Sequence, residues 1–572
     1  MPVVNATIAA IFDEIADLLD IQAANPFRVR AYRNAARTIG ELGSDVKTWI
    51  KRGSALTDIP GIGADLAGKI QEIVDTGKCT FLERLHKEMP SAVTELLHLP
   101  GLGPKRVKIL WHDLGIETMD QLLKAAEEGR IRQLHGFGEK TEQTILDAVH
   151  KHLGQARRFK LAIATQYADA CLSHLRAVPG VRRAEAAGSL RRMKETVGDI
   201  DLLVMADASS PVMERFTGYE EVKQVLASGP TRGTVVLKNG IQVDIRVVVP
   251  DSYGAALVYF TGSKAHNIAI RRIAQERDLK INEYGVFKGV KRIAGETEGS
   301  VYAAIGLAWI PPELREDRGE VEAAAQSKLP HLVEMSDLRG DLHVHSKASD
   351  GHNTIEEMAL AAKDRGLEYI AITEHSKRLT VARGLDAVRL TKQCGEIDRL
   401  NERLSGVTVL KGIEVDILED GSMDLPDSVL AKLDIVVAAV HSKFDLPRAR
   451  QTQRILKALD NPHVRILAHP SGRLIDEREP YDADMEKIIR KARTRRIALE
   501  VNAHPDRLDL LDTLCQMAKQ EGASVVIDSD AHSAFEFDSL RFGVGQARRG
   551  WIEKSDVVNT RSLKQLHTWL QR

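Results

Sequence analysis

The spacing of hydrophobic residues divides the chain into three zones. In residues 1–150, apolar positions recur at helical spacing and predict helices. In residues 188–250 the apolar runs are short and β-rich, and Asn239-Gly240 joins two of them in the pattern of a β-hairpin. After residue 338, seven apolar runs alternate with helical segments, which is typical of an α/β barrel. We therefore expect a multidomain α/β protein.

Composition adds little to this pattern but excludes some classes of protein. The chain has 572 residues, too many for one domain, and is 43% hydrophobic and 28% charged, as expected for a soluble globular protein. Its net charge is −1, so any contact with nucleic acid must come from local patches. We expect neither a membrane span nor a signal peptide, and four scattered cysteines indicate a reducing cytoplasm.

Three stretches in the helical zone share one pattern, a Gly-x-Gly turn that opens an apolar helix: 57–73, 96–110 and 131–146. Glycines at such turns let backbone amides approach a DNA phosphate at a helix N-terminus. Tight helical turns also use glycine, but three in succession resemble helix-hairpin-helix motifs, which bind the DNA backbone without reading sequence. The expected contacts are Gly61, Gly63, Gly101, Gly103, Lys105, Gly136, Gly138 and Lys140.

Two carboxylates mark the β-rich zone. Asp199 and Asp201 are one residue apart in an apolar run that reads as a strand, so both point to the same face. On an edge strand they would be two solvated acids, but paired acids on one face also suit a divalent metal. Just upstream, Gly188 and Ser189 form a turn that can approach an anion, with Arg192 nearby. A metal site beside a phosphate clamp indicates phosphoryl transfer.

Metal-capable residues follow most of the apolar runs of the third zone. One histidine at a strand end is usually polar surface, but nine such residues at successive strand ends indicate a metal centre. They suit two or three Zn²⁺ or Mn²⁺ ions, with Glu414 and Asp530 as bridging carboxylates. A run at 497–503 lacks a ligand, although Glu500 and Asn502 could support the others. The expected ligands are His343, His345, Asp350, His375, Glu414, His441, His469, Asp530 and His532.

The GS…RR…GDID element resembles the nucleotidyltransferase palm of family X DNA polymerases, the group with a DNA polymerase beta-like core. The resemblance implies that Asp244 is a third metal carboxylate and that two Mg²⁺ or Mn²⁺ ions serve nucleotidyl transfer. The stretch 259–272, in which Gly262 breaks a strand-like start before a helix, resembles the family segment that packs under the nucleotide sugar and base pair. The implied nucleotide-binding residues are Gly188, Ser189, Arg192, Gly198, Tyr259, Phe260, Gly262, Asn267 and Arg271.

The sequence also departs from the family pattern. Lys264 replaces an acid near the incoming base, and Gln242 replaces an arginine near the primer terminus. Residues 1–80 resemble the small N-terminal domain that removes 5′-deoxyribose phosphate, and Lys69 matches its Schiff-base lysine. A lysine of that pocket is Asp65 here, so Lys69 is a candidate either for lyase catalysis or for binding a 5′ phosphate.

The third zone resembles the polymerase and histidinol phosphatase (PHP) domain, and the nine ligand positions all match. This resemblance implies hydrolysis of phosphoesters, with Arg473 as a candidate phosphate contact. Beside a polymerase, the substrate implied is a DNA end: a 3′→5′ exonuclease, a 3′-phosphatase or an abasic-site endonuclease.

Nearly the whole chain resembles bacterial family X DNA polymerases with a C-terminal PHP domain, which implies a monomeric cytoplasmic (nucleoid) repair enzyme that acts on gapped or nicked DNA and dNTPs. Three alternatives stay open: a nuclease whose palm only positions DNA, a barrel that is a metal-stabilised scaffold, and a phosphatase of small metabolites. The expected parts are a small helical domain (1–80), a helix-hairpin-helix region (81–154), a palm of mixed sheet and helices (155–250), a thumb-like base-pair-binding subdomain (251–317), a linker (318–337) and a distorted seven-stranded, TIM-like barrel (338–572).

Overall fold

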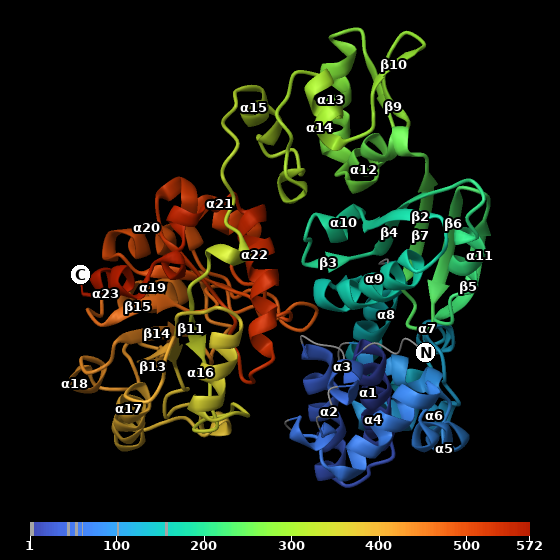
Figure 1. Cartoon of the computed structure of the whole chain (residues 1–572). Helices are drawn as coiled ribbons and strands as arrows, with labels where there is room; N and C mark the ends of the chain where they lie inside the picture. Colours follow the sequence, from blue (N-terminus) through green and yellow to red (C-terminus); the bar gives the residue numbers. More distant parts are fainter. Residues whose placement is uncertain are drawn as a thin grey trace. The chain divides into compact units, whose positions relative to one another are not determined.

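A computed structural model gives the fold, and it describes residues 5–42, 46–51, 55–59, 61–99, 102–154 and 158–571. The chain forms two compact units, Met1–Phe159 and Lys160–Arg572, which run from blue to teal and from teal to red in Figure 1. Within the described residues, every helix is too short or too polar to cross a lipid bilayer.

The first unit is helical, as its hydrophobic spacing predicts. In α1 the side chains of Ile8, Phe12 and Ile15 recur at helical spacing and are fully buried. Helix α2 begins where the Asn25 side chain accepts a hydrogen bond from the amide of Phe27. The helices are α1 (Asn5–Ile21), α2 (Pro26–Glu41), α3 (Val46–Lys51), α4 (Ala64–Thr76), α5 (Thr80–Glu88), α6 (Pro104–Leu114), α7 (Met119–Glu127) and α8 (Glu139–Gly154).

The three predicted glycine turns precede α4, α6 and α8. Gly63 and Gly103 are the N-cap residues of the first two helices. Gly61 and Gly136 have backbone φ angles of 76° and 85°, a conformation that residues other than glycine rarely adopt. Gly101 lies outside the described residues. The helical turns expected from the sequence are therefore confirmed where the structure describes them.

The second unit begins with a palm built on a mixed five-stranded sheet of order β2-β4-β7-β6-β5. Strands β6 and β7 form the predicted hairpin around Asn239-Gly240, and β4 runs parallel to β7. The palm elements are β1 (Phe159–Lys160), α9 (Leu161–Arg176), β2 (Val181–Ala186), α10 (Gly188–Arg191), β3 (Thr196–Val197), β4 (Asp199–Ala206), α11 (Val212–Thr217), β5 (Val222–Ser228), β6 (Arg232–Leu237) and β7 (Gln242–Val248).

A thumb-like subdomain follows, and it corrects one expectation. The strand-like start at Tyr259 is the end of a helix, α12, because its apolar residues are buried on several sides rather than in a sheet. Helix α15 lies in the predicted linker, yet Val321 and Ala324 pack in the thumb core. The elements are α12 (Tyr253–Thr261), α13 (Lys264–Gln275), β8 (Lys280–Asn282), β9 (Gly285–Lys288), β10 (Lys291–Ala294), α14 (Glu298–Ala304) and α15 (Glu320–Ala325).

The C-terminal part is the predicted seven-stranded parallel barrel, ordered β11 through β17. A parallel bridge joins Val344, at the end of β11, to Ala531, three residues after the end of β17, and so brings the two ends of the sheet together. The elements are β11 (Gly340–Val344), α16 (Ile355–Asp364), β12 (Tyr369–Ile372), α17 (Ala387–Asn401), β13 (Thr408–Asp416), α18 (Asp427–Leu430), β14 (Ile435–Ala439), α19 (Arg448–Ala458), β15 (Val464–Leu467), α20 (Met485–Arg495), β16 (Ala498–Asn502), α21 (Asp512–Glu521), β17 (Val525–Asp528), α22 (Leu540–Arg549) and α23 (Leu563–Leu570).

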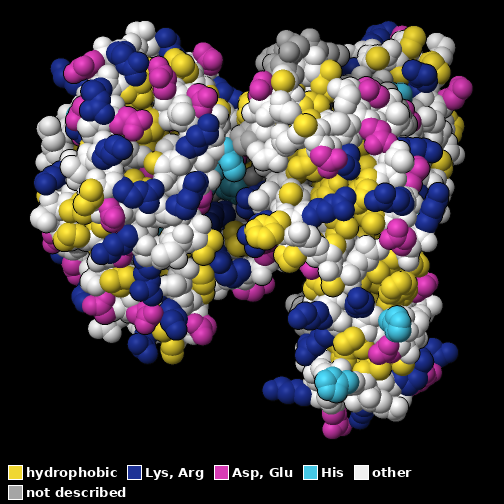
Figure 2. Space-filling model, turned by 90° about the horizontal axis from the view of Figure 1, so that it is seen from below, with side chains coloured by type: hydrophobic (Ala, Val, Ile, Leu, Met, Phe, Trp, Pro, Cys, Tyr) yellow, Lys and Arg dark blue, Asp and Glu magenta, His cyan; other side chains and the backbone are white. Residues whose placement is uncertain are grey.

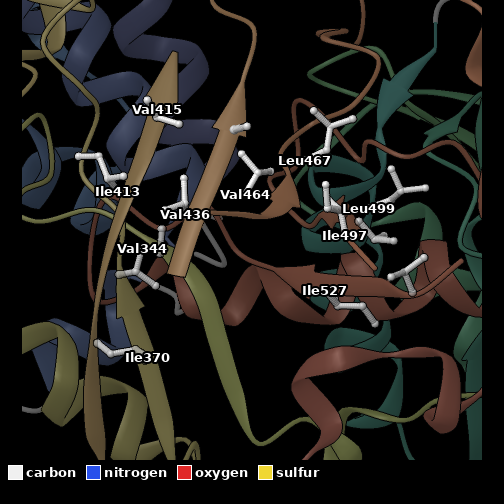
Figure 3. Close-up of a cluster of buried hydrophobic side chains, with 14 of the residues drawn as sticks. Val344, Ile370, Ile413, Val415, Val436, Val464, Leu467, Ile497, Leu499 and Ile527 are labelled. Atoms are coloured by element: carbon white, nitrogen blue, oxygen red, sulfur yellow. The ribbon is translucent and has the colours of Figure 1, made fainter. Parts of the chain in front are cut away.

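Side chains alternate along the barrel strands, as they must on a pleated backbone. Ile370 and Val436 belong to the large cluster that packs against the surrounding helices (Figure 3). Ala371 and Val437 belong to a second cluster that includes Leu566 of α23. This closely packed frame fixes the strand ends, and with them the side chains that follow each strand.

Two candidate metal centres

The three predicted palm carboxylates come together. Asp199 and Asp201 lie on one face of β4, and Asp201 is in register with Asp244 on the parallel strand β7. One ligand oxygen from each residue lies within 4.8 Å of the other two. That spacing is suitable for oxygen ligands that share divalent cations.

The electrostatics of this cluster favour a cation. Burial, followed by the neighbouring charges of Asp199 and Asp244, raises the pKa of Asp201 to about 7. Asp244 accepts hydrogen bonds from Thr234 Oγ1 at 2.5 Å and from Gln242 Nε2 at 2.7 Å. The glutamine that departs from the family pattern thus orients a carboxylate, and the oxygen-rich cluster fits Mg²⁺ or Mn²⁺.

Position 188, next to this cluster, has room only for a glycine. Its φ is 60°, and a Cβ at this position would lie 2.1 Å from Oδ2 of Asp201. The next residue, Ser189, lies in the short helix α10, and Gly198 directly precedes Asp199. The predicted turn therefore places its backbone directly against the carboxylates.

Arg192 lies beside this turn but is already engaged. Its Nε is 3.0 Å from Oε1 of Glu316, and its Nη1 donates to the backbone oxygen of Thr261 at 2.5 Å. An incoming polyphosphate would have to compete with Glu316 for this guanidinium group. The sequence predicts the arginine but not its carboxylate partner, which is 124 residues away.

The predicted base-pair residues form one group at the junction of α12 and α13. The rings of Tyr259 and Phe260 meet edge to face, with centroids 5.0 Å apart. Arg271 lies over the Tyr259 ring, and Asn267 donates to the Tyr259 backbone oxygen at 2.8 Å. Gly262, with φ of 71°, ends α12 between these two helices. The structure thus brings together the residues predicted to face a nucleotide.

At the barrel, the predicted ligands converge around the carboxyl ends of the strands. Glu414 is central: its Oε1 lies 3.1 Å from His441 Nε2 and 3.0 Å from His469 Nε2. Its Oε2 lies 2.5 Å from His375 Nδ1. A carboxylate whose two oxygens face different histidines is well placed to bridge two ions.

The other two carboxylates complete the arrangement. Asp530 Oδ1 lies 3.2 Å from His345 Nε2 and 3.5 Å from His343 Nε2. Asp350 lies 3.3 Å from His375 Nε2 and 3.5 Å from His532 Nε2. All nine residues singled out from the sequence are therefore in this centre.

Unpartnered nitrogen atoms show that the centre fits metal ions. Among the described residues, Nε2 of His343, Nδ1 of His469 and both ring nitrogens of His345 and His441 are buried without a hydrogen-bond partner, a costly state for polar atoms unless a ligand occupies them. Burial, followed by the neighbouring rings of His532 and others, lowers the pKa of His345 to about 3. Its imidazole is therefore neutral at physiological pH, which is the form that binds a metal.

A second layer of polar groups orients these ligands. Glu500 lies 2.6 Å from His343 Nδ1, and the Asn502 side chain donates to Asp530 at 3.0 Å, as expected for supporting groups. The sequence does not predict a further supporting carboxylate, Asp416, whose Oδ1 lies 3.4 Å from His441 Nδ1. Its position two residues after Glu414 on β13 was the available signal, since alternate strand residues share a face.

The phosphate contact proposed for Arg473 is not supported. This side chain is buried, donates to the backbone oxygen of Leu508 at 2.5 Å and lies 2.8 Å from Glu195 of the palm. Arg507 instead reaches the centre, with Nε 3.4 Å from Oδ2 of Asp530. The sequence placed Arg473 after the right strand but could not give the direction of its side chain.

In the first unit, Lys69 lies in a cationic cluster. Its Nζ is 2.5 Å from Oδ1 of Asp65. The charged groups of Lys69, Arg28 and Arg84 all lie within 5.5 Å of the centroid of the Phe81 ring. Burial lowers the pKa of Lys69, but the hydrogen bond to Asp65 and the nearby Tyr32 and Asp65 groups together outweigh it, and the net shift of the pKa is upward. Lys69 is therefore protonated at neutral pH, as a phosphate-binding lysine would be.

Two such centres in one chain define a metal-dependent phosphoryl-transfer protein. Family models support this assignment part by part. Residues 3–79 match a helix-hairpin-helix domain and residues 93–151 a SAM-like helix-hairpin-helix tandem. Residues 256–316 match the DNA polymerase beta thumb, and residues 341–504 match the PHP domain.

Relatives extend the match to the full length. The chain is 40% identical over 571 residues to the DNA polymerase/3′-5′ exonuclease PolX of Bacillus subtilis, covering 99% of both chains. It is also 31% identical over 232 residues to probable phosphatases of Thermoanaerobacter species, covering 38% of this chain and 89% of each relative. The chain belongs to the family X DNA polymerases that carry helix-hairpin-helix regions and a C-terminal PHP domain.

Proposed function

We propose that the palm catalyses template-directed addition of nucleotides to fill short gaps in DNA. The single observation that carries this proposal is the register of Asp201 with Asp244, which gathers three carboxylates on one face. When bound there, two Mg²⁺ or Mn²⁺ ions would activate the primer hydroxyl and stabilise the leaving pyrophosphate. The full-length similarity to a DNA polymerase supports the same reaction.

The remaining palm residues then have separate roles. Ser189 and Arg192 hold the β- and γ-phosphates, once Arg192 has exchanged Glu316 for the nucleotide. Tyr259 and Phe260 pack under the sugar and exclude a ribose 2′ hydroxyl. Asn267 and Arg271 face the base pair. The contacts among these side chains support the assignment because they hold the aromatic pair in one orientation.

A gap-filling assay tests this role. A duplex with a one-nucleotide gap is incubated with dNTPs and Mn²⁺, and extension of the primer is followed beside the Asp201→Ala variant. We expect extension by the wild type and its loss in the variant, with 3′ shortening retained. A wild type that shortens 3′ ends but extends no primer would instead indicate a nuclease whose palm only positions DNA, and extension that survives in Asp201→Ala would contradict the three-carboxylate site.

We propose that the barrel hydrolyses phosphoesters at DNA 3′ ends as a 3′→5′ exonuclease. The convergence of nine ligands with unpartnered buried nitrogens supports two or three Zn²⁺ or Mn²⁺ ions, which would supply a nucleophile and polarise the phosphate. The related activities on a 3′ phosphate or an abasic site need only a different leaving group at the same ions.

Two comparisons separate this role from its rivals. His343→Ala should abolish 3′ shortening and leave gap filling intact, whereas loss of both with a lower melting temperature would indicate a metal-stabilised scaffold. The similarity to probable phosphatases raises the third possibility. Turnover of a DNA 3′ end against histidinol phosphate decides it, and we expect DNA to be preferred.

We propose that Lys69 binds a 5′ phosphate at the downstream side of a gap. A Schiff base requires a neutral amine, and the partner Asp65 disfavours that form. Lys69→Ala should weaken binding to a gap with a 5′ phosphate more than to one with a 5′ hydroxyl. Borohydride trapping on a 5′-deoxyribose phosphate end tests the lyase alternative, and a strong covalent adduct would favour it.

We also propose where and with what the protein acts. The exposed Gly63, Gly103, Lys105, Gly138 and Lys140 of the helix-hairpin-helix turns contact the backbone of gapped or nicked DNA. The protein works as a monomer in the bacterial cytoplasm, at the nucleoid. Size-exclusion chromatography with light scattering, without and with gapped DNA, tests the monomeric state.

A further inference from the structure

Three barrel strands lead into the same tripeptide, His-Ser-Lys. It occurs at residues 345–347, 375–377 and 441–443, after β11, β12 and β14. In each copy the histidine is a candidate metal ligand. The lysine is exposed in each copy, so a repeated pattern places a cation two residues beyond a metal ligand three times around one centre.

The central serines explain how this geometry arises. Ser346 is buried and donates to Glu374, while Ser376 is buried and accepts a hydrogen bond from the amide of Asp416 at 2.9 Å. In the third copy, the backbone oxygen of Ser442 accepts from Arg454 at 2.8 Å. Each tripeptide is thus anchored at its middle residue, and the lysine is its first exposed residue.

The three ammonium groups are available for a ligand. In the part of the chain that the structure describes, the side chains of Lys347, Lys377 and Lys443 have no carboxylate within ion-pair distance, although the charge of Lys347 acts at longer range on the Glu357 carboxylate and that of Lys377 on the Asp424 carboxylate. Figure 2 shows histidine side chains at the edge of the left lobe, with Lys and Arg side chains on the surface nearby. Metal ions in the centre would add to this positive field.

We propose that Lys347, Lys377 and Lys443 form a basic rim that holds the phosphates of an unpaired DNA 3′ end. This proposal rests on the exonuclease function of the barrel. Cleavage of one linkage at the ions leaves neighbouring phosphates of the same strand near the rim, and lysines are suited to bind them without reading sequence. A small phosphate monoester offers no second phosphate for the rim.

Burial of the ligands favours a single strand over a duplex. His343 and His345 are 0% exposed, and His375 is only 8% exposed. A duplex end is too wide to bring its terminal phosphoester to such deeply placed side chains, whereas an unpaired strand is narrow and flexible. The rim would therefore guide the last nucleotides of a frayed or mispaired primer.

A triple variant, Lys347→Ala with Lys377→Ala and Lys443→Ala, tests the rim. The matched control removes three exposed lysines near the starts of strands or on α23, namely Lys363, Lys432 and Lys564. Both full-length variants are compared with wild type for kcat/KM on a labelled 3′ overhang and on bis(p-nitrophenyl) phosphate. Melting temperatures check that each variant is folded.

The expected result is selective. Loss of three phosphate contacts should lower kcat/KM on the overhang roughly 30-fold near physiological salt and reduce the salt slope by about 2, with a much smaller change on the small phosphodiester and little change in the control. Equal losses of kcat/KM on both substrates, or a loss shared by the control variant, would contradict the proposed rim but not the exonuclease function. A wild type that hydrolyses the small phosphodiester but no DNA would overturn the exonuclease function and the rim together.

Discussion

Arg549, at the end of α22 in the barrel domain, donates a hydrogen bond at 2.7 Å to the backbone oxygen of Arg192 in the palm. Both guanidinium groups also contact the carboxylate of Glu316, at 2.9 and 3.0 Å. The arginine proposed to hold the nucleotide phosphates is therefore tied, through one carboxylate, to the domain that carries the nuclease.

The first prediction concerns this carboxylate. Glu316→Gln should lower the KM for dNTPs a few-fold, because the nucleotide no longer competes with a charged partner of Arg192. Steady-state gap filling measures the KM. Glu313→Gln is the matched control, since Glu313 pairs with Arg548 at 2.7 Å and does not contact Arg192. A rise in KM in the Glu316 variant would show that the pair orients Arg192 for binding.

The second prediction concerns the close contact at Gly188. A Cβ there would lie 2.1 Å from Asp201 Oδ2, so Gly188→Ala must displace the carboxylate. We expect at least ~100-fold loss of nucleotide incorporation, the usual scale for a 1 Å displacement of a reacting group, with 3′ shortening unchanged. Single-turnover incorporation measures the loss, and a variant within threefold of wild type would contradict the assignment.

Local spacing in the sequence predicts the metal ligands of both centres, but it does not predict the long-range partners of the residues around them. The carboxylates Asp199 and Asp201 and the strand-end histidines follow from local spacing, because strand alternation and barrel topology convert sequence position into direction. The partner Glu316 is far from Arg192 in the chain, and no local pattern connects them. The residues near Tyr259 read as a strand because aromatic and β-branched types favour strands, but burial within the thumb overrides that preference.

The third prediction concerns the amide that orients Asp244. Gln242→Leu removes the 2.7 Å hydrogen bond to Oδ2 and should raise the Mn²⁺ concentration for half-maximal incorporation about 10-fold, as loss of a supporting group at a metal ligand does. Metal titration of gap filling measures it. Gln224→Leu, at an exposed position of β5, is the control. An unchanged titration would mean that Thr234 alone orients the carboxylate.

The fourth prediction follows from the pKa of Asp201. Without metal, the folded chain holds this proton up to about pH 7, whereas the unfolded chain releases it near the ordinary aspartate pKa of 3.8. Between these values the folded state binds more protons, so its stability falls as pH rises from about 4 to 7. In EDTA, the melting temperature of wild type should fall over this range more steeply than that of Asp201→Asn. Parallel curves would contradict the shift.

The last prediction separates orientation from ligation in the barrel. Glu500 lies 2.6 Å from His343 Nδ1 and accepts a hydrogen bond from the amide of His469 at 2.6 Å, so it fixes two ligands without being one of the nine. Glu500→Gln can still accept a hydrogen bond but removes the charge that strengthens the imidazole as a donor.

We expect this variant to lose metal affinity 10- to 100-fold, the usual range for such supporting carboxylates. Metal content after dialysis and recovery of 3′ shortening during Mn²⁺ titration measure the change. At saturating Mn²⁺ the rate of shortening should return close to that of wild type, because the ligands themselves are intact. His343→Ala, which removes a ligand, should not recover at any Mn²⁺ concentration. A Glu500→Gln variant that also fails to recover would place this carboxylate among the groups that act directly on the substrate.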